Sequence, residues 1–207
     1  QSPAMVDRYL QLRAEDNMQV VNCTTPANYF HVLRRQLRRD FRKPLVIMTP
    51  KSLLRQKGCV SSLADMGPGT TFHRVLDERD TQVKSGKAKR VVMCSGKVYY
   101  DLAAARDEAK MWDVEIIRVE QLYPFPTRAV TEVLEQVPNA TMVWCQEEPR
   151  NMGGWSFARD FIEEAMQTVG ASQQRLTYTG RAAAASPATG TLGRHKREQA
   201  QLVADAL

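Results

Sequence analysis

The chain has 207 residues, of which 43% are hydrophobic and 25% are charged, with a formal net charge of +6. This composition is typical of a globular protein with one large or two small domains, and it argues against disorder, collagen and coiled coil. No apolar run approaches the roughly 18–20 residues of a membrane-spanning helix. The N-terminus has no signal-peptide pattern, and the absence of an initial Met predicts a processed chain or a fragment.

The first part of the chain predicts a helix, a strand, a second helix and a second strand, at residues 6–14, 18–21, 26–39 and 45–48. Thr25 is placed to cap the second helix, and Pro26 suits its first turn, where a missing backbone N–H is of no consequence. The last of these segments, Leu-Val-Ile-Met, is typical of a buried parallel strand. The order strand, helix, strand therefore predicts half of a βαβ unit.

Residues 51–88 are rich in glycine and poor in apolar residues, which predicts an extended connection with one short strand near 72–76. Strands and helices then alternate: strands are expected at 90–96, 114–120, 141–148 and 175–180, and helices at 97–110, 127–137, 155–169 and 194–207. Thr127 is expected to cap the helix that it begins. This alternation predicts an α/β fold with a parallel sheet covered by helices on both faces.

The four cysteines have no CxxC or CxxH spacing, and the three histidines lie far apart in the sequence. We therefore expect neither a zinc site nor a disulfide framework. Cys94 and Cys145 lie inside apolar strands, where a buried free thiol is the usual state of a cysteine.

The positive charge is concentrated near the N-terminus. Residues 1–60 hold 11 Lys or Arg and 4 Asp or Glu, whereas residues 61–207 hold 18 and 19. Most of this excess lies in the basic run RRQLRRDFRK (34–43). In a helix, Arg34, Arg38 and Arg42 stack at i, i+4 spacing, as do Arg35 and Arg39. Like charges stacked in this way repel one another, which favours an anionic neighbour. The candidates are nucleic acid, a phosphate-bearing effector and an acidic neighbouring domain, and the plain alternative is a solvated helix face. No RNA- or DNA-binding signature accompanies the charge, so nucleic acid is disfavoured.

Two short motifs carry groups suited to anion binding or acid–base chemistry, but neither predicts a complete active site. The turn 94–97, Cys-Ser-Gly-Lys, exposes backbone N–H groups and a lysine at a helix start, which suits an anion or is simply a tight turn. Glu147 and Glu148 end a strand, where acid–base groups often lie, but neighbouring strand residues point to opposite faces. We therefore expect a structural or interface role for the two carboxylates, and no nucleotide-binding glycine motif is present.

Seven segments, in chain order, resemble the C-terminal part of the thiamin-diphosphate-dependent E1 component of the 2-oxoglutarate dehydrogenase complex. They are TTPANYFHVLRRQ (24–36), PLVIMTPKSLLR (44–55), KRVVMCSGKVYYDL (89–102), EQLYPFP (120–126), WCQEEPRNMGGW (144–155), YTGRAAAASPATG (178–190) and HKREQAQLVADAL (195–207). The resemblance implies the end of a transketolase-like pyrimidine-binding α/β domain in residues 1–55 and a linker in 56–88. It implies a transketolase-type C-terminal domain with a parallel sheet in 89–207.

The resemblance also implies what the parent protein does. The family decarboxylates 2-oxoglutarate and transfers the succinyl group to the lipoyl group of the E2 succinyltransferase, a step of the tricarboxylic acid cycle. The segments that bind thiamin diphosphate and Mg²⁺ are expected upstream of residue 1, so no catalytic, cofactor-binding or metal-binding residue is assigned in this chain. Gln1 stands where a substrate-contacting histidine of the family would fall, and Met5 where an arginine would. The fragment alone is therefore expected to be structural or regulatory, and inactive.

Partners and a regulatory site are implied in the same way. Relatives form homodimers and bind acetyl-CoA or AMP, and the basic residues expected near that site are Arg42, Lys43, Lys51 and Arg55. No membrane association is expected, and the location is the bacterial cytoplasm or the mitochondrial matrix. Two alternatives stay open: a related decarboxylase for a longer 2-oxo dicarboxylate, and a basic module that binds nucleic acid or another anion.

Overall fold

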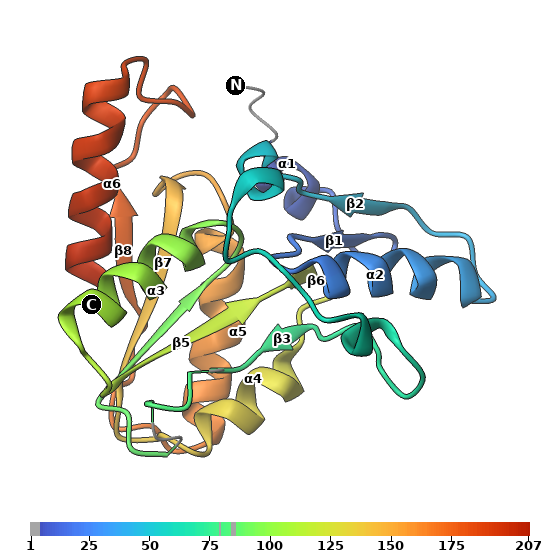
Figure 1. Ribbon diagram of the computed structural model, residues 1–207, viewed down its shortest axis with the longest axis horizontal. Helices are drawn as coiled ribbons and strands as arrows, with labels where there is room; N and C mark the ends of the chain where they lie inside the picture. Colours follow the sequence, from blue (N-terminus) through green and yellow to red (C-terminus); the bar gives the residue numbers. More distant parts are fainter. Residues whose placement is uncertain (1–4, 79, 84–85) are drawn as a thin grey trace.

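Two β-sheets form the framework of the computed structural model, which describes residues 5–78, 80–83 and 86–207 (Figure 1). The larger sheet has the order β3-β5-β4-β7-β8, with strands Val75–Leu76, Val114–Val119, Arg90–Cys94, Thr141–Pro149 and Thr177–Arg181. The smaller sheet has the order β2-β1-β6, with strands Leu45–Ile47, Gln19–Val21 and Gln121–Tyr123. The prediction for Gln1 falls outside the described residues.

Helices cover both faces of the larger sheet, as the alternating pattern predicts (Figure 1). On one face, α3 (Val98–Ala109) and α6 (Leu192–Ala206) pack on apolar side chains of β4, β5 and β7. On the other face, α4 (Thr127–Leu134) and α5 (Trp155–Thr168) enclose a second core around Trp144. The parallel pairing of β5, β4, β7 and β8 confirms the predicted fold class.

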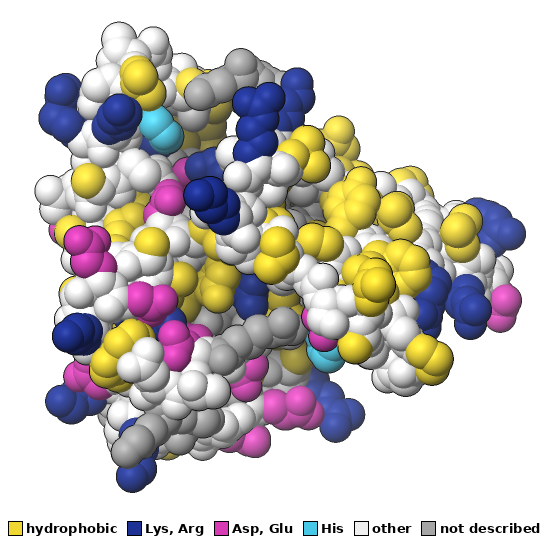
Figure 2. Space-filling view, in the orientation of Figure 1, with side chains coloured by type: hydrophobic (Ala, Val, Ile, Leu, Met, Phe, Trp, Pro, Cys, Tyr) yellow, Lys and Arg dark blue, Asp and Glu magenta, His cyan; other side chains and the backbone are white. Residues whose placement is uncertain are grey.

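The N-terminal part contributes α1 (Val6–Gln11), α2 (Pro26–Arg38) and two short 3₁₀ helices, η1 (Lys51–Arg55) and η2 (Leu63–Met66). The inner face of α2 packs on the smaller sheet through Val32, beside Val21 and Phe72. Its outer face carries exposed apolar side chains, which Figure 2 shows gathered over α2 and the neighbouring β2.

The polypeptide passes directly from the larger sheet to the smaller one. Only Glu120 separates β5 from β6, and β6 pairs antiparallel with β1. Glu120 is fully buried and accepts hydrogen bonds from the Thr24 backbone N–H (2.9 Å) and from Asn28 Nδ2 (2.9 Å). Because Thr24 leads into α2 and Asn28 lies in its first turn, this carboxylate connects the N-terminal part to the larger sheet.

The structure differs from the sequence-based expectations at a few ends and edges. Thr127 is not a cap: Pro126 holds the N-cap position without a side-chain hydrogen bond, and Thr127 is the first helical residue. The strand β6 was not expected, and it and β3 pair antiparallel with their neighbours. Prolines follow β6 directly, so its sequence has a turn-like composition, and its strand conformation comes from pairing with β1.

The helix cap at Thr25 is confirmed and gives a first testable prediction. Its Oγ1 accepts a hydrogen bond from the Asn28 backbone N–H (3.2 Å), with Pro26 in the first turn. Thr25→Ala should lower the free energy of unfolding by about 1 kcal/mol, because this N–H loses its partner. Urea denaturation followed by tryptophan fluorescence measures the change, with Thr71→Ala, an exposed threonine outside the helices, as control. Equal effects of the two substitutions would contradict the capping role.

Candidate functional site

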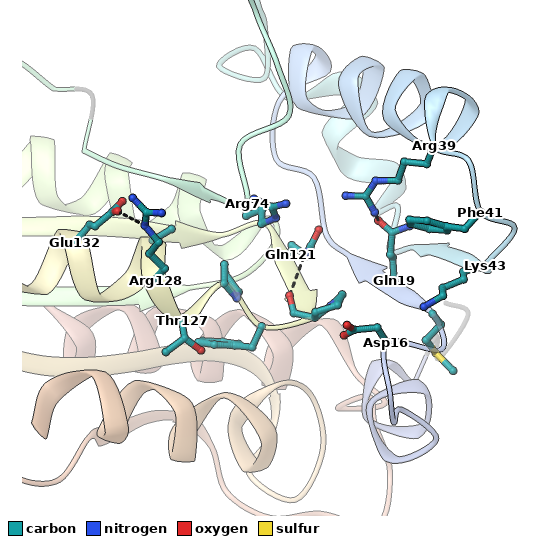
Figure 3. Close-up of a pocket in the computed structure, with 15 residues that line it drawn as sticks. Asp16, Gln19, Arg39, Phe41, Lys43, Arg74, Gln121, Thr127, Arg128 and Glu132 are labelled. Atoms are coloured by element: carbon teal, nitrogen blue, oxygen red, sulfur yellow. Dashed lines mark hydrogen bonds and ion pairs between the residues drawn. The ribbon is translucent and has the colours of Figure 1, made fainter. Parts of the chain in front are cut away.

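A cleft of about 760 Å³ lies where the smaller sheet meets the β6–α4 connection (Figure 3). Polar side chains from five separate segments line it. The cationic ones are Arg39, Lys43, Arg74 and Arg128, and the acidic ones are Asp16 and Glu132. A cavity of this size is large enough for a nucleotide-sized ligand.

Two glutamine side chains position Arg35 of α2 and Arg39, the residue that follows this helix. Gln19 on β1 accepts hydrogen bonds through Oε1 from Arg35 Nη2 (2.9 Å) and Arg39 Nη1 (2.8 Å). Gln121 on β6 accepts from the same Arg35 nitrogen (2.8 Å) and donates to the Pro124 carbonyl (2.7 Å). These contacts position two guanidinium groups without neutralising either of them, because an amide oxygen carries no net charge.

The guanidinium groups lie close enough to affect one another's ionisation. Burial lowers the pKa of Arg35 to about 10, with further lowering by the charges of Arg39 and Arg74. Burial and the charge of Arg74 also lower the pKa of Arg39. Among the residues that the structure describes, none of the three forms an ion pair with a carboxylate within 4.0 Å. The cluster is therefore an uncompensated positive site, and an anion bound there would restore the balance of charge.

Aromatic rings supply an apolar component. Phe41 lines the cleft between two cations, with Arg39 Cζ 5.1 Å and Lys43 Nζ 5.4 Å from its ring centroid. Phe125 lines the cleft between two prolines, on the connection that leads into α4. At the α4 end, Arg128 Nε forms an ion pair with Glu132 at 2.7 Å, so that cation is already compensated (Figure 3).

The four basic residues that were expected near an effector site do not lie together in the structure. Lys43 lines the cleft, while Arg42 is exposed and donates from Nη1 to the Arg39 carbonyl (3.3 Å). Lys51 and Arg55 lie exposed on η1 and are not among the residues that line the cleft. Arg35 and Arg39 belong to the basic run that the sequence analysis singled out, whereas Arg74 and Gln121 carried no such signal.

The lysine of the turn at 94–97 already has an anionic partner. Lys97 forms an ion pair with Glu147 from the end of β7. Burial, together with the charge of Glu147, raises the pKa of Glu148. The two adjacent carboxylates have different surroundings, as their positions on a strand predict, and the pair with Lys97 supports a structural role.

The buried thiols are as expected. Cys94 and Cys145 are free, fully buried and paired in register across β4 and β7. Burial raises the pKa of Cys145 to about 12 and raises that of Cys94, so both stay protonated and unreactive near neutral pH. In the described part of the chain, no group of three or more His, Cys, Asp or Glu side chains is placed to hold a metal ion, and no helix is long and apolar enough to cross a membrane.

Comparisons with known proteins agree with this architecture. Residues 60–207 match the family described as 2-oxoglutarate dehydrogenase C-terminal, and residues 1–57 match the transketolase pyrimidine-binding domain. Over 214 aligned residues, the chain is 54% identical to the 2-oxoglutarate dehydrogenase E1 components of Brucella ovis and Brucella canis, and 53% identical to that of Brucella abortus. Each alignment covers 100% of this chain and 21% of the relative, so the chain spans about a fifth of its relatives' length.

Proposed function

Because the chain belongs to the 2-oxoglutarate dehydrogenase E1 family, we propose that its parent protein decarboxylates 2-oxoglutarate and transfers the succinyl group to the E2 lipoyl group. The reaction is that of a thiamin-diphosphate enzyme, in which the cofactor stabilises the carbanion. The described residues offer no cluster of ligands for Mg²⁺, and we assign no catalytic step to residues of this chain. The relatives are bacterial, which supports a cytoplasmic location. The expected partners are a second E1 chain and the E2 succinyltransferase.

The role of this segment is the binding of a phosphate-bearing effector, acetyl-CoA or AMP, in the arginine cleft. The observation that carries this proposal is the cluster of Arg35, Arg39 and Arg74. Burial and the charge of Arg74 lower the pKa of both Arg35 and Arg39, and none of the three forms an ion pair with a carboxylate of the described residues. Guanidinium groups suit phosphate oxygens because they present several N–H donors in one plane. Lys43 adds a fourth positive charge beside Phe41, whose ring offers a stacking surface for a base.

The cleft geometry separates two sets of basic residues. Lys43 stays in the proposed site and is joined by Arg39 and Arg74, which also line the cleft. Arg35 does not line the cleft but shares the Gln19 side chain with Arg39. Arg42, Lys51 and Arg55 do not line the cleft, so they serve as a comparison set in any test. A general attraction of anions to the basic N-terminal part would involve both sets, whereas a specific site would involve only the first.

The proposal predicts that Arg39→Gln raises the dissociation constant for acetyl-CoA or AMP about tenfold, because one charge-assisted hydrogen bond to phosphate is lost. Isothermal titration calorimetry of the purified chain measures the constants at low and moderate salt. Arg38→Gln is the matched control, since Arg38 lies one residue away on the exposed side of α2. Two results would contradict the site. One is that the folded, unsubstituted chain shows no saturable binding. The other is that affinity falls as much in Arg38→Gln and in a Lys51→Gln/Arg55→Gln variant as it does in Arg39→Gln.

The chain by itself is expected to be inactive. Mixing it with thiamin diphosphate, Mg²⁺, 2-oxoglutarate and a redox dye should give no turnover above the blank. Steady dye reduction would contradict this expectation. For the full-length parent protein, comparison of 2-oxoglutarate with a longer 2-oxo dicarboxylate decides between the two substrate assignments.

A further inference from the structure

Two glutamines, Gln19 and Gln121, line the arginine cleft, and each is only 3% exposed. Burying an amide is unfavourable unless its polar atoms are hydrogen-bonded, and both ends of Gln121 are. Its Oε1 accepts from Arg35 Nη2 at 2.8 Å, and its Nε2 donates to the Pro124 carbonyl at 2.7 Å. The donor end therefore fixes this side chain to the β6–α4 connection, and the acceptor end meets a guanidinium group.

Gln19 begins a chain of amides in which all hydrogen bonds run in one direction. Its Oε1 accepts from Arg35 and Arg39, and its Nε2 donates to Gln36 Oε1 at 3.0 Å. Gln36 Nε2 in turn donates to the Lys43 carbonyl at 2.7 Å. Each link needs a side chain that accepts at one end and donates at the other, as an amide does and a carboxylate does not. The chain thereby connects the backbone at Lys43 to both guanidinium groups.

The amides also leave the positive charge of the cleft uncompensated. Glutamate has nearly the size of glutamine, and at position 19 or 121 it would place a carboxylate at hydrogen-bond distance from a guanidinium group (Figure 3). A charge-assisted pair of that kind is roughly twice as strong as a neutral hydrogen bond. Among the described residues, no ion pair joins a carboxylate to Arg35, Arg39 or Arg74. The neutral wall therefore leaves these cations available to an anion from solution.

We propose that Gln19 and Gln121 are positioning residues of the effector site. They hold Arg35 and Arg39 in place and, because they are neutral, leave the charge of the cluster free to pair with a phosphate group. This inference rests on the proposed effector function and adds what sets the strength of the site. A carboxylate at either position would act as a built-in competitor of the phosphate, since both would use the same guanidinium donors.

Isothermal titration calorimetry of the full-length polypeptide with AMP tests the proposal. Gln19→Glu and Gln121→Glu should each raise the dissociation constant at least about tenfold, because the new carboxylate takes up donors that the phosphate needs. Gln167→Glu is the matched control, since Gln167 is exposed on α5 and does not line the cleft. It adds the same charge at a distance, where salt screens it, and should change the constant by less than about twofold.

Gln121→Met separates the effect of charge from that of positioning. Methionine is neutral and of similar length, so the guanidinium groups stay uncompensated but lose one hydrogen-bond acceptor. Affinity for AMP should fall less than in Gln121→Glu. Only the glutamate variant should weaken the dependence of affinity on salt concentration, because it removes one unit of net positive charge from the site. Equal losses in the two variants, with the same salt dependence, would mean a merely structural role and would overturn the proposal.

The outcomes distinguish this inference from the function on which it rests. If the unsubstituted polypeptide bound neither AMP nor acetyl-CoA, the effector function would be wrong, and the inference with it. If it bound AMP and both glutamate variants bound as tightly as Gln167→Glu, the inference alone would be wrong. If one glutamate variant did not fold, the substitution at the other position would give the same test.

Discussion

Replacing Glu120 with Ala should lower the free energy of unfolding by about 3–5 kcal/mol, the range typical of breaking a buried charged network. Glu120 is fully buried and accepts three hydrogen bonds, from the Thr24 backbone, the Thr24 hydroxyl and the Asn28 amide. The Thr24 hydroxyl in turn accepts from Arg118 Nη1 at 3.1 Å. The substitution leaves the two Thr24 donors without this acceptor, whereas Asn28 Nδ2 keeps the His73 carbonyl (2.8 Å). It also removes the carboxylate that interacts electrostatically with Arg118.

Urea denaturation of the Glu120→Ala variant and of the unsubstituted chain measures this loss of stability. Glu120→Gln keeps the size of the side chain and one acceptor oxygen, so its loss should be smaller, about 1–3 kcal/mol. The control is Glu164→Ala on the exposed side of α5, where surface substitutions usually change stability by less than about 0.5 kcal/mol. If Glu120→Ala changed stability no more than Glu164→Ala, the carboxylate would not join the two sheets as described.

Glu115 should make the chain less stable as pH rises through neutrality. It is 3% exposed on β5, and its Oε2 is buried without a hydrogen-bond partner. Burial, with the charges of Asp77 and Glu78 facing it, raises the pKa of Glu115 to about 7. In the unfolded chain the pKa is the ordinary one, about 4.3. Between about pH 4.3 and about pH 7, Glu115 is therefore protonated in the folded state but ionised in the unfolded state. The corresponding stability is fully present below about pH 4.3 and is lost as pH rises through 7.

Glu115→Gln removes this titration, because the amide resembles the protonated acid in size and in its ability to donate. Above pH 7 the variant should exceed the unsubstituted chain in free energy of unfolding by up to about 4 kcal/mol, the amount that a shift of this size represents. The difference between variant and parent should shrink as the pH falls from 8 to 4.5. Urea denaturation across this range measures it, with the exposed Glu108→Gln as control. A difference that stays constant with pH would contradict the role assigned to Glu115.

The elements that could be predicted from the sequence are those whose local pattern and tertiary surroundings agree. Strands β4, β5 and β7 are rich in apolar residues, and the structure buries most of their side chains between helices on both faces. The start of α2 follows from Thr25 and Pro26, whose roles depend only on neighbouring backbone. The strand β6 follows from no local pattern, because its pairing with β1 creates it.

The candidate site was predictable only in part, for the same reason. The basic run at 34–43 pointed to an anion, and Arg39 and Lys43 from that run do line the cleft. Arg74 and Gln121 come from distant parts of the sequence, and only the junction of the two sheets brings them beside α2. Lys51 and Arg55 lie near Lys43 along the chain, but η1 carries them away from the cleft. Sequence distance was therefore a poor guide to which cations share a site.

The pairing of β1 with β6 also has a consequence for how the molecule is assembled. Val20 and Tyr123 are partners in this ladder although about a hundred residues separate them along the chain. Contacts between such distant residues close a long loop and form slowly compared with local ones. During synthesis, β1 and α2 leave the ribosome long before β6 exists. Through that interval the smaller sheet lacks one of its three strands, and α2 has apolar side chains with no stable support. Nascent chains are thus most exposed to aggregation between the emergence of α2 and that of β6.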